Sequence, residues 1–190
     1  MCASTPICTN LYYETFQTSL GLMLLAMSER GVCFLHFGNS ESHLRQTLQS
    51  TFPLASLTPS RAQHKDTARQ VEKLVHQLLT NGSCEETPAL FFQGTPFQQD
   101  VWRYLRTIPP GEVRTYADVA KSIGRPRAVR AAASACARNT IALLVPCHRV
   151  IRGDGAFGGY RWGIDKKASL LTAEKRGLHK SPSTTTKAGA

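Results

Sequence analysis

The sequence lacks any apolar run that approaches the roughly 18 residues a membrane-spanning helix requires. It also lacks, at the N-terminus, a basic region followed by an apolar stretch and a small-residue cleavage site, so no secretory signal is evident. These absences predict an intracellular protein, cytoplasmic or (in a eukaryotic cell) nuclear, with no membrane partner.

Cysteine pairs with metal-ligand spacing are also missing, because the six cysteines are scattered and form no CxxC pair. Each is by default a small buried hydrophobic residue with a free thiol in a reducing compartment. A structural zinc ion could use Cys8, Cys33 or His36, but their spacing matches no zinc motif. We therefore predict neither a metal nor a cofactor. The cysteines are Cys2, Cys8, Cys33, Cys84, Cys136 and Cys147.

Acidic residues are scarce in only one half of the chain. Residues 97–180 contain 16 Lys and Arg against 6 Asp and Glu, whereas residues 1–96 contain 6 against 7. A basic excess confined to half the sequence indicates a surface that binds a polyanion, and nucleic acid is the first candidate. A merely soluble basic surface, the alternative, would spread the charge more evenly.

The first half of the chain predicts a small α/β domain. Helical spacing of apolar residues occurs at 40–51 and again at 67–80. Before these helices come three short apolar runs separated by turn residues, which predict a three-stranded antiparallel meander. The three runs are Leu11–Gln17, Leu22–Met27 and Val32–Phe37.

Polar segments mark the expected boundaries. Residues 53–66 connect the two predicted helices, and Asn81–Gly94, with its Gly, Pro and acidic residues, predicts an interdomain linker. We therefore divide the chain into domains at 1–90 and 91–179, with a disordered Ser/Thr/Gly-rich tail at 180–190.

The second half begins with two helix-start signals. Thr95-Pro96-Phe97-Gln98 and Thr115-Tyr116-Ala117-Asp118 are both capping boxes. The first helix ends at Pro109-Pro110-Gly111, and the second runs to Ile123 and ends at Gly124. A third helix follows from Pro126 to Asn139. Two short helices joined by a glycine turn are typical of a helix-turn-helix, although helical bundles that do not bind DNA share the pattern.

The third predicted helix has an unusual surface. Val129, Ala133 and Cys136, at i, i+4 and i+7, predict its core-facing side. Its other side combines small residues with a few arginines, which permits close approach and suits a minor groove better than a major groove. An Ala-rich packing helix with arginines extended into solvent is the alternative. The polar residues on that side are Arg127, Arg130, Ser134 and Arg138.

A candidate nucleophile follows the apolar run Ile141–Val145, which predicts a buried strand. Cys147 and His148 stand at its end, before a glycine-rich loop, as a thiol beside a base. Because adjacent side chains usually diverge, their coupling would pass through a water molecule.

The last predicted helix, from Asp165 to Arg176 with Gly177 as terminator, supplies a carboxylate. Glu174 lies on the face of Leu170 and Leu171, and a half-buried carboxylate needs a partner such as a histidine. A buried cysteine, a surface histidine and a rim glutamate remain the ordinary interpretation of these three residues.

The segment Pro146–Val150, PCHRV, is the active-site signature of the O6-alkylguanine-DNA alkyltransferases, and the chain resembles this family from Gly94 through Glu174. The matching stretches include GTPFQQDVWRYLRTIP, GEVRTYADVAKSIGRPRAVRAAASACARN and GYRWGIDKKASLL. The last looks most like the C-terminal half of bacterial adaptive-response proteins. Residues 1–90 resemble the family's ribonuclease-H-like N-terminal domain only in layout. The resemblance implies an α/β N-terminal domain and a mainly α C-terminal domain with a helix-turn-helix.

The resemblance also implies roles for single residues. Cys147 corresponds to the alkyl acceptor, His148 to a water-linked base, and Glu174 to the carboxylate that polarises this base. Asn139 corresponds to a hinge asparagine. Tyr116 corresponds to the tyrosine that crowds the 3′ phosphate and donates a hydrogen bond toward guanine N3.

The residues expected to contact DNA or substrate follow in the same way. Arg130 corresponds to the arginine that fills the base stack after the nucleotide is extruded, and Tyr160 and Val150 correspond to pocket walls. Arg161 stands at the pocket rim, where some relatives have a serine. Arg127 and Ser134 complete the expected binding face.

The resemblance therefore implies DNA repair by a single irreversible transfer of an alkyl group from O6 of guanine to Cys147, with O4 of thymine as a further candidate substrate. The expected partner is double-stranded DNA, bound by a monomer through the minor groove without sequence preference. A non-catalytic lesion sensor of the alkyltransferase-like class would replace the acceptor cysteine. A combined repair protein and transcription activator would need a further metal-bound cysteine domain, and residues 1–90 contain no four-cysteine cluster. A Cys–His hydrolase would show turnover on an ester or amide.

Overall fold

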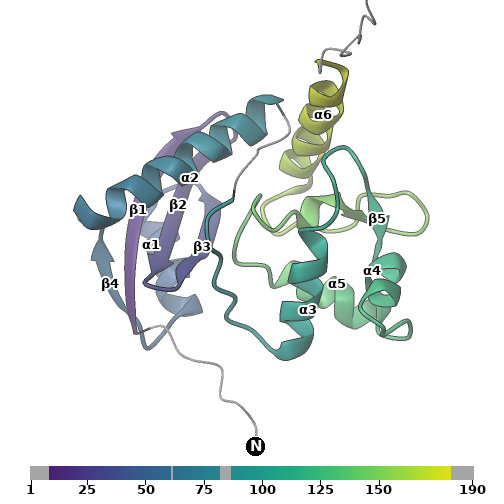
Figure 1. Cartoon of the computed structure of the whole chain (residues 1–190), viewed down its shortest axis with the longest axis horizontal. Coiled ribbons are helices and arrows are strands. Elements are labelled where there is room, and N and C mark those ends of the chain that lie inside the picture. The colour runs from purple at the N-terminus through teal and green to yellow at the C-terminus, as the bar shows by residue number, and fades with distance from the viewer. Residues whose placement is uncertain (1–8, 61, 82–86, 181–190) are drawn as a thin grey trace, which may run out of the picture.

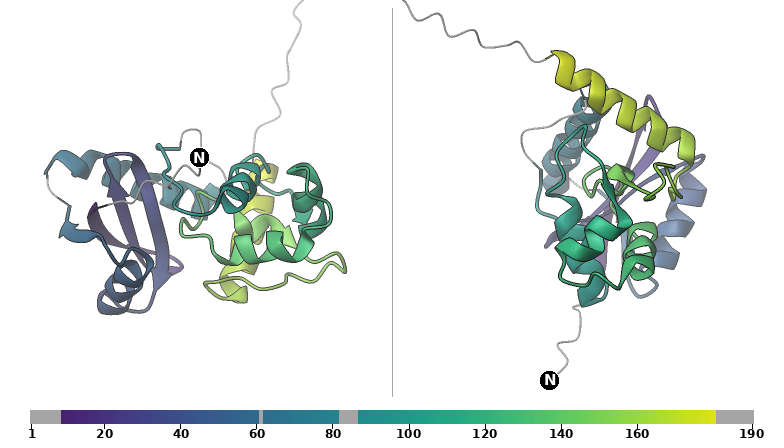
Figure 2. Two further views of the ribbon diagram at one scale, coloured as in Figure 1. Left: turned by 90° about the horizontal axis from the view of Figure 1, so that it is seen from below. Right: turned by 90° about the vertical axis from the view of Figure 1, so that its right-hand side faces the viewer.

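The computed structural model describes residues 9–60, 62–81 and 87–180. A sheet with two helices forms one half, and a mainly helical half lies beside it (Figures 1 and 2). The elements of the first half are β1 (Asn10–Thr18), β2 (Gly21–Ser28), β3 (Gly31–Gly38), α1 (Glu41–Thr51), β4 (Ser56–Pro59) and α2 (Ala62–Asn81).

The sheet has the strand order β3-β2-β1-β4. β1 and β3 both pair antiparallel with β2, and β4 pairs parallel with β1. Successive side chains of β2 enter different apolar clusters, since Met23 and Leu25 pack with α2 residues while Leu24 packs with Leu48 of α1. This alternation buries both faces of the sheet, one under each helix.

The second half consists of short elements around the segment 139–151. They are α3 (Pro96–Leu105), β5 (Arg114–Thr115), α4 (Tyr116–Ser122), α5 (Val129–Ala137), the 3₁₀ helix η1 (Cys147–Arg149), β6 (Val150–Ile151) and α6 (Ile164–Lys180). Both predicted capping boxes are present. Thr95 accepts from Gln98 N and Thr115 from Asp118 N, and each partner side chain accepts in return from the capping residue's N–H.

The two halves share one hydrophobic core. A single cluster of buried residues runs from β2, β3 and α2 into α3, α4, α5 and α6. The backbone also connects them, because the N–H of Leu35 on β3 donates to Thr140 O, and Ala142 N donates to Leu35 O, both at 2.8 Å. The edge strand β3 therefore carries the start of the segment that leads to Cys147 (Figure 1).

The predicted three-stranded antiparallel sheet is wrong in one respect, since the sheet has a fourth, parallel strand. β4 lies within the stretch 53–66, which we had interpreted as a polar connection. It is four residues long, partly exposed and ends in proline, so it has neither the length nor the alternation that predicts a strand. The three other strands and the helices at 40–51 and 67–80 are confirmed, with α2 starting at Ala62.

The predicted strand Ile141–Val145 is also wrong. Ile141 forms a single bridge with Leu35, and the chain then turns, with Leu143 at φ 67° in the left-handed region. All five residues are buried, so the apolar run correctly indicated burial. Burial alone does not distinguish a strand from a turn whose backbone groups are satisfied by other partners.

Two helix predictions need adjustment. α5 begins at Val129 rather than Pro126, and its buried residues are Ala132, Ala135 and Cys136, whereas Val129 and Ala133 are half-buried. A run of alanines leaves the helical phase poorly determined, which explains the rotated face.

The last helix continues past Gly177 to Lys180, so Gly177 does not terminate it. The central part of the predicted linker, 82–86, and the predicted tail from 181 onward lie outside the described residues. No helix in the described ranges is long and apolar enough to cross a membrane.

Two glycines with positive φ provide a test of the sheet. Gly21 and Gly31 have φ of 113° and 123°, but a Cβ at Gly31 would lie 2.3 Å from Ala89 O, whereas a Cβ at Gly21 would meet nothing within 4 Å. We expect Gly21→Ala to cost about 1 kcal/mol through backbone strain alone. Gly31→Ala should cost about 3 kcal/mol, because the clash adds to the strain. Urea denaturation measures both, and equal losses would contradict the contact between β3 and the segment at Ala89.

Candidate active site

Asn139 organises the turn that precedes Cys147. Its side-chain oxygen accepts from Ile141 N at 2.9 Å, and its amide nitrogen donates to Val145 O at 2.9 Å and to Ile141 O at 3.3 Å. These hydrogen bonds satisfy backbone N–H and C=O groups that, in a β-strand, would pair with a neighbouring strand. The same amide nitrogen lies 3.3 Å from Cys147 Sγ, so one buried side chain both shapes the turn and contacts the thiol.

Three consecutive side chains of η1 are buried: Cys147, His148 and Arg149. His148 Nε2 lies 2.7 Å from Glu174 Oε1 on α6. Because an ionised carboxylate only accepts, Nε2 carries the proton and Nδ1 is left as the basic nitrogen. In the part of the chain that the structure describes, Nδ1 is buried and has no hydrogen-bond partner.

Glu174 is 4% exposed, and both of its carboxylate oxygens accept hydrogen bonds. Besides His148, Oε1 accepts from Arg149 Nε at 3.0 Å and Nη2 at 2.9 Å, and Oε2 accepts from Gly111 N at 2.9 Å. Burial raises the pKa of Glu174, but the hydrogen bonds from His148 and Arg149, with the positive charge of Arg149, outweigh it and lower the pKa to about 2. The carboxylate is therefore ionised at neutral pH.

The thiol and the imidazole are both uncharged at rest. Burial raises the pKa of Cys147 to about 11, although the Asn139 hydrogen bond opposes this shift. Burial also lowers the pKa of His148, against the opposing effect of Glu174. The result is a protonated thiol beside a neutral base.

A pocket of about 530 Å³ opens at Cys147. Burial holds the pKa of Tyr160 well above its ordinary value and, to a smaller extent, raises that of Tyr116, so both phenols are protonated. The floor and walls come from α4, α5, η1 and the loop before α6. The lining residues are Tyr116, Ala133, Cys136, Ala137, Cys147, Arg152, Gly158, Gly159, Tyr160 and Arg161.

The structure brings most of the predicted residues together, but not all. Val150, expected as a pocket wall, does not line the pocket and is fully buried in the core. Arg127 and Arg130 are exposed near the start of α5, and Ser134 accepts a hydrogen bond from Arg138 Nη1. Arg130 and Ser134 share α5 with Ala133 and Ala137, which line the pocket, whereas Arg127 precedes this helix and Arg138 follows it.

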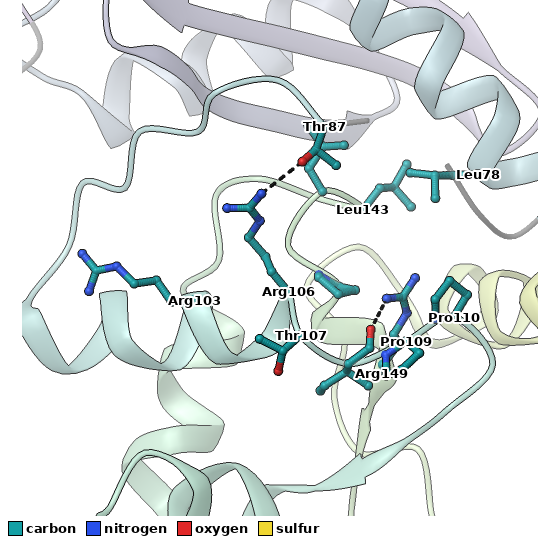
Figure 3. A pocket seen from close by; sticks show the side chains of 12 residues that line it. Leu78, Thr87, Arg103, Arg106, Thr107, Pro109, Pro110, Leu143 and Arg149 are labelled. Carbon is teal, nitrogen blue, oxygen red and sulfur yellow. Dashed lines mark hydrogen bonds between the residues drawn. The ribbon is translucent and has the colours of Figure 1, made fainter. Parts of the chain in front are cut away.

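Two buried cations were missed by the sequence analysis. Arg149 connects Glu174 to the carbonyl of Ile108 at the end of the α3 segment (Figure 3). Lys167 of α6, which is fully buried, donates to the carbonyls of Val150 and Phe157. For Arg149, the available signal in the sequence was an arginine directly after Cys147-His148, in a segment that is otherwise largely apolar. Lys167 follows an exposed-looking Asp-Lys pair and gave no signal.

Arg149 also lines a second cavity of about 440 Å³, on the other side of the turn from Cys147. Leu143, Pro146, Arg103 and Arg106 also line it, and Arg106 donates to Thr87 Oγ1 at 3.0 Å (Figure 3). The active-site turn thus separates two hollows, only one of which contains the thiol.

No group of three or more potential His, Cys, Asp or Glu ligands gathers within the described residues. Of the three residues considered for zinc, Cys8 lies outside those residues. Cys33 donates to Ala26 O, and His36 packs against aromatic rings.

Residues 96–176 match the family model described as 6-O-methylguanine DNA methyltransferase, DNA binding domain. The bifunctional transcriptional activator/DNA repair enzyme Ada of Escherichia coli is 44% identical over 85% of this chain. The chain spans 45% of that protein's length, and 42% of the length of the regulatory protein ada of Salmonella typhimurium. The predicted likeness to one part of the adaptive-response proteins agrees with these matches.

Relatives matched over nearly their whole length also occur. The methylated-DNA–protein-cysteine methyltransferase of Methanosarcina barkeri is 38% identical over 88% of this chain and 99% of its own. The crystal structure of Mycobacterium tuberculosis OGT in complex with DNA superposes with a TM-score of 0.70 at 33% identity, covering 87% of this chain and 94% of that one. With the Cys-His-Glu geometry and these matches together, the chain belongs to the methylated-DNA–protein-cysteine methyltransferase family.

Proposed function

We propose that this protein repairs DNA by transferring an alkyl group from O6 of guanine to Cys147 Sγ, once per molecule. The observation that carries the proposal is a buried thiol at a pocket, next to a neutral histidine that is held by an ionised carboxylate. O4 of thymine presents the same kind of alkylated oxygen and is a second candidate substrate.

The first step is extrusion of the damaged nucleotide. O6 of guanine is inaccessible inside the duplex, so the base has to rotate into the pocket at a cost of a few kcal/mol, and a lesion that pairs poorly lowers this cost. Exposed Arg127, in the turn before α5, and exposed Arg130 on α5 supply positive charge for the phosphates. Arg130 fills the space that the extruded base leaves in the stack.

The second step activates the thiol. With a pKa of about 11, Cys147 is almost entirely protonated at neutral pH. His148 Nδ1 accepts the thiol proton through a bridging water, and the imidazolium that forms is stabilised by Glu174 at 2.7 Å. Asn139 donates to the developing thiolate.

The third step is displacement at the alkyl carbon. The S–C bond forms while the C–O6 bond breaks, and guanine leaves as an anion. Tyr116, whose hydroxyl is protonated at the pocket, supplies a proton at N3. The product is a thioether. Because a thiolate is a poor leaving group from a neutral thioether, the acceptor is not regenerated.

The DNA-binding mode rests on α4 and α5. The chain turns between them at Gly124, whose φ of 71° suits a glycine. Alanines and one half-buried serine make the exposed side of α5 shallow, which favours insertion into a minor groove without sequence preference. We propose that these helices act as a helix-turn-helix on double-stranded DNA and that the protein works as a monomer.

For the remaining organisation we propose two domains, 1–90 and 91–179. The sheet order β3-β2-β1-β4, three antiparallel strands followed by a parallel one, supports a ribonuclease-H-like N-terminal domain. The shared core makes this division one of sequence and topology, not of independent packing.

The acceptor is tested by Cys147→Ser. A hydroxyl is far harder to ionise than a thiol, so transfer should be abolished while DNA affinity stays within a few-fold of the wild type. After incubation with an O6-methylguanine oligonucleotide, the intact mass of the wild-type protein should increase by one methyl group. Peptide mapping should place this group on the peptide that contains Cys147. Repeated turnover by a substoichiometric amount of wild-type protein would exclude the proposal and favour a hydrolase.

The role of the carboxylate is tested by Glu174→Gln. This change weakens the hold on His148, and transfer should slow strongly. The change should also cost about 3–5 kcal/mol of stability, because buried Arg149 loses its counter-charge. Leu11→Ala, which opens a cavity on β1 two strands away from β3, is the destabilised control and should transfer normally when folded.

The ionised state of Glu174 also predicts how the stability of the protein depends on pH. Because the folded-state pKa of Glu174 is about 2 against an ordinary 4.5, its contribution is complete above pH 4.5 and is lost as the pH falls toward 2. Glu174→Gln should lack this part of the acid transition. Wild-type transfer rates in folded Glu174→Gln across pH 6 to 9 would refute the assigned role.

Base extrusion is separated from chemistry by Arg130→Ala. The side chain is exposed on α5 and does not line the pocket, so the variant should react almost normally with free O6-alkylguanine base. Duplex repair should be much slower, because the extruded state loses the group that fills the stack. Arg127→Ala, which removes the same charge nearby, should weaken DNA binding without this selective loss. Equal losses on base and duplex would mean that Arg130 supports the fold.

A further inference from the structure

Strand β3 of the N-terminal sheet contacts the active-site region at several residues, which include Leu35, His36 and Phe37, whose ring lies 6.4 Å from that of Trp162. Leu35 forms the backbone hydrogen bonds to Thr140 and Ala142 that carry the turn before Cys147. His36, the next residue, contacts Trp162 in the loop that forms the pocket wall, with ring centroids 5.0 Å apart and an interplanar angle of 89°.

The contact at His36 begins a series of edge-to-face aromatic rings. Trp162 contacts Tyr160 at 5.1 Å, and Tyr160 contacts His148 at 6.4 Å with an interplanar angle of 84°. Tyr160 lines the pocket beside Cys147. The series therefore extends from the N-terminal sheet through the pocket wall to the catalytic base.

The His36 side chain acts at this position as a buried, uncharged aromatic ring. The ring is 3% exposed and stacks on Phe34 with centroids 4.0 Å apart. Its Nε2 atom has no hydrogen-bond partner among the described residues. Burial, with a contribution from the charge of Arg161, lowers the pKa of His36 to about 3, so the ring is neutral wherever the protein is active.

We infer that His36 is a positioning residue for alkyl transfer: supported by Phe34, it holds Trp162 and through it the Tyr160 wall against His148. Edge-to-face pairs of this kind contribute energy beyond simple burial and have a preferred geometry. The loop from Gly153 to Gly163 contains five glycines and little regular structure, so its aromatic residues need support from outside the loop. This inference rests on the proposed function and gives the N-terminal half a part in it.

The test is single-turnover transfer by His36→Ala, with a methylated duplex, resolved into DNA affinity and saturating rate. DNA affinity should be unchanged, because His36 is 3% exposed and offers no surface to DNA. The saturating rate should fall about ten-fold, which corresponds to about 1.4 kcal/mol in the barrier. The chain has two tryptophans and Trp102 is buried, so increased acrylamide quenching of fluorescence in His36→Ala would report a freed Trp162.

Two further variants make the result decisive. His36→Phe keeps an aromatic ring of similar shape and should restore both the rate and the protection of Trp162. Leu11→Ala creates a cavity on β1, two strands away from β3 in the sheet, and should lower stability without affecting the saturating rate of the folded protein.

The inference is overturned if His36→Ala transfers at the wild-type rate, if Leu11→Ala loses as much rate, or if Trp162 stays equally protected in His36→Ala. Failure of the wild type itself to transfer would instead refute the proposed function. In that case the quenching comparison would still decide whether His36 holds Trp162.

Discussion

A buried carboxylate, Glu174, is the group on which the site depends. Removing a charge from water costs several kcal/mol, and this cost is offset only when the charge is paired and its lone pairs are filled. Here His148, Arg149 and the N–H of Gly111 meet that requirement. Because these donors come from η1 and from the turn after α3, satisfying one carboxylate also fixes where both segments lie against α6.

The same burial determines the protonation states of the two reacting groups. It raises the pKa of Cys147 and lowers that of His148, so the resting pair is a thiol and a neutral imidazole. Under the proposed single transfer, this resting state keeps the nucleophile inert toward other electrophiles. In that proposal, proton transfer to His148 follows once substrate fills the pocket and displaces bulk water, and Glu174 stabilises the imidazolium that forms.

The two halves of the molecule divide the task. The exposed Arg127 and Arg130 and the shallow face of α5 lie in the second half, whereas β3 supports the turn and the pocket wall from behind. A single continuous core transmits this support, since close-packed interiors deform little. The N-terminal half, although it contributes none of the reacting groups, therefore bears on their geometry.

What the sequence determined by itself was local. The capping boxes at Thr95 and Thr115, the three alternating strands and the Pro-Cys-His signature depend on neighbours within a few residues, and each could be recognised without a structure. Tertiary structure decided the rest. The apolar run after Asn139 became a turn because one side chain satisfied its backbone groups, and β4 formed because β1 had an open edge to pair with. Arg149, Lys167 and His36 acquired their positions from partners distant in sequence, and the energy of a buried polar contact depends on where the partner lies in space.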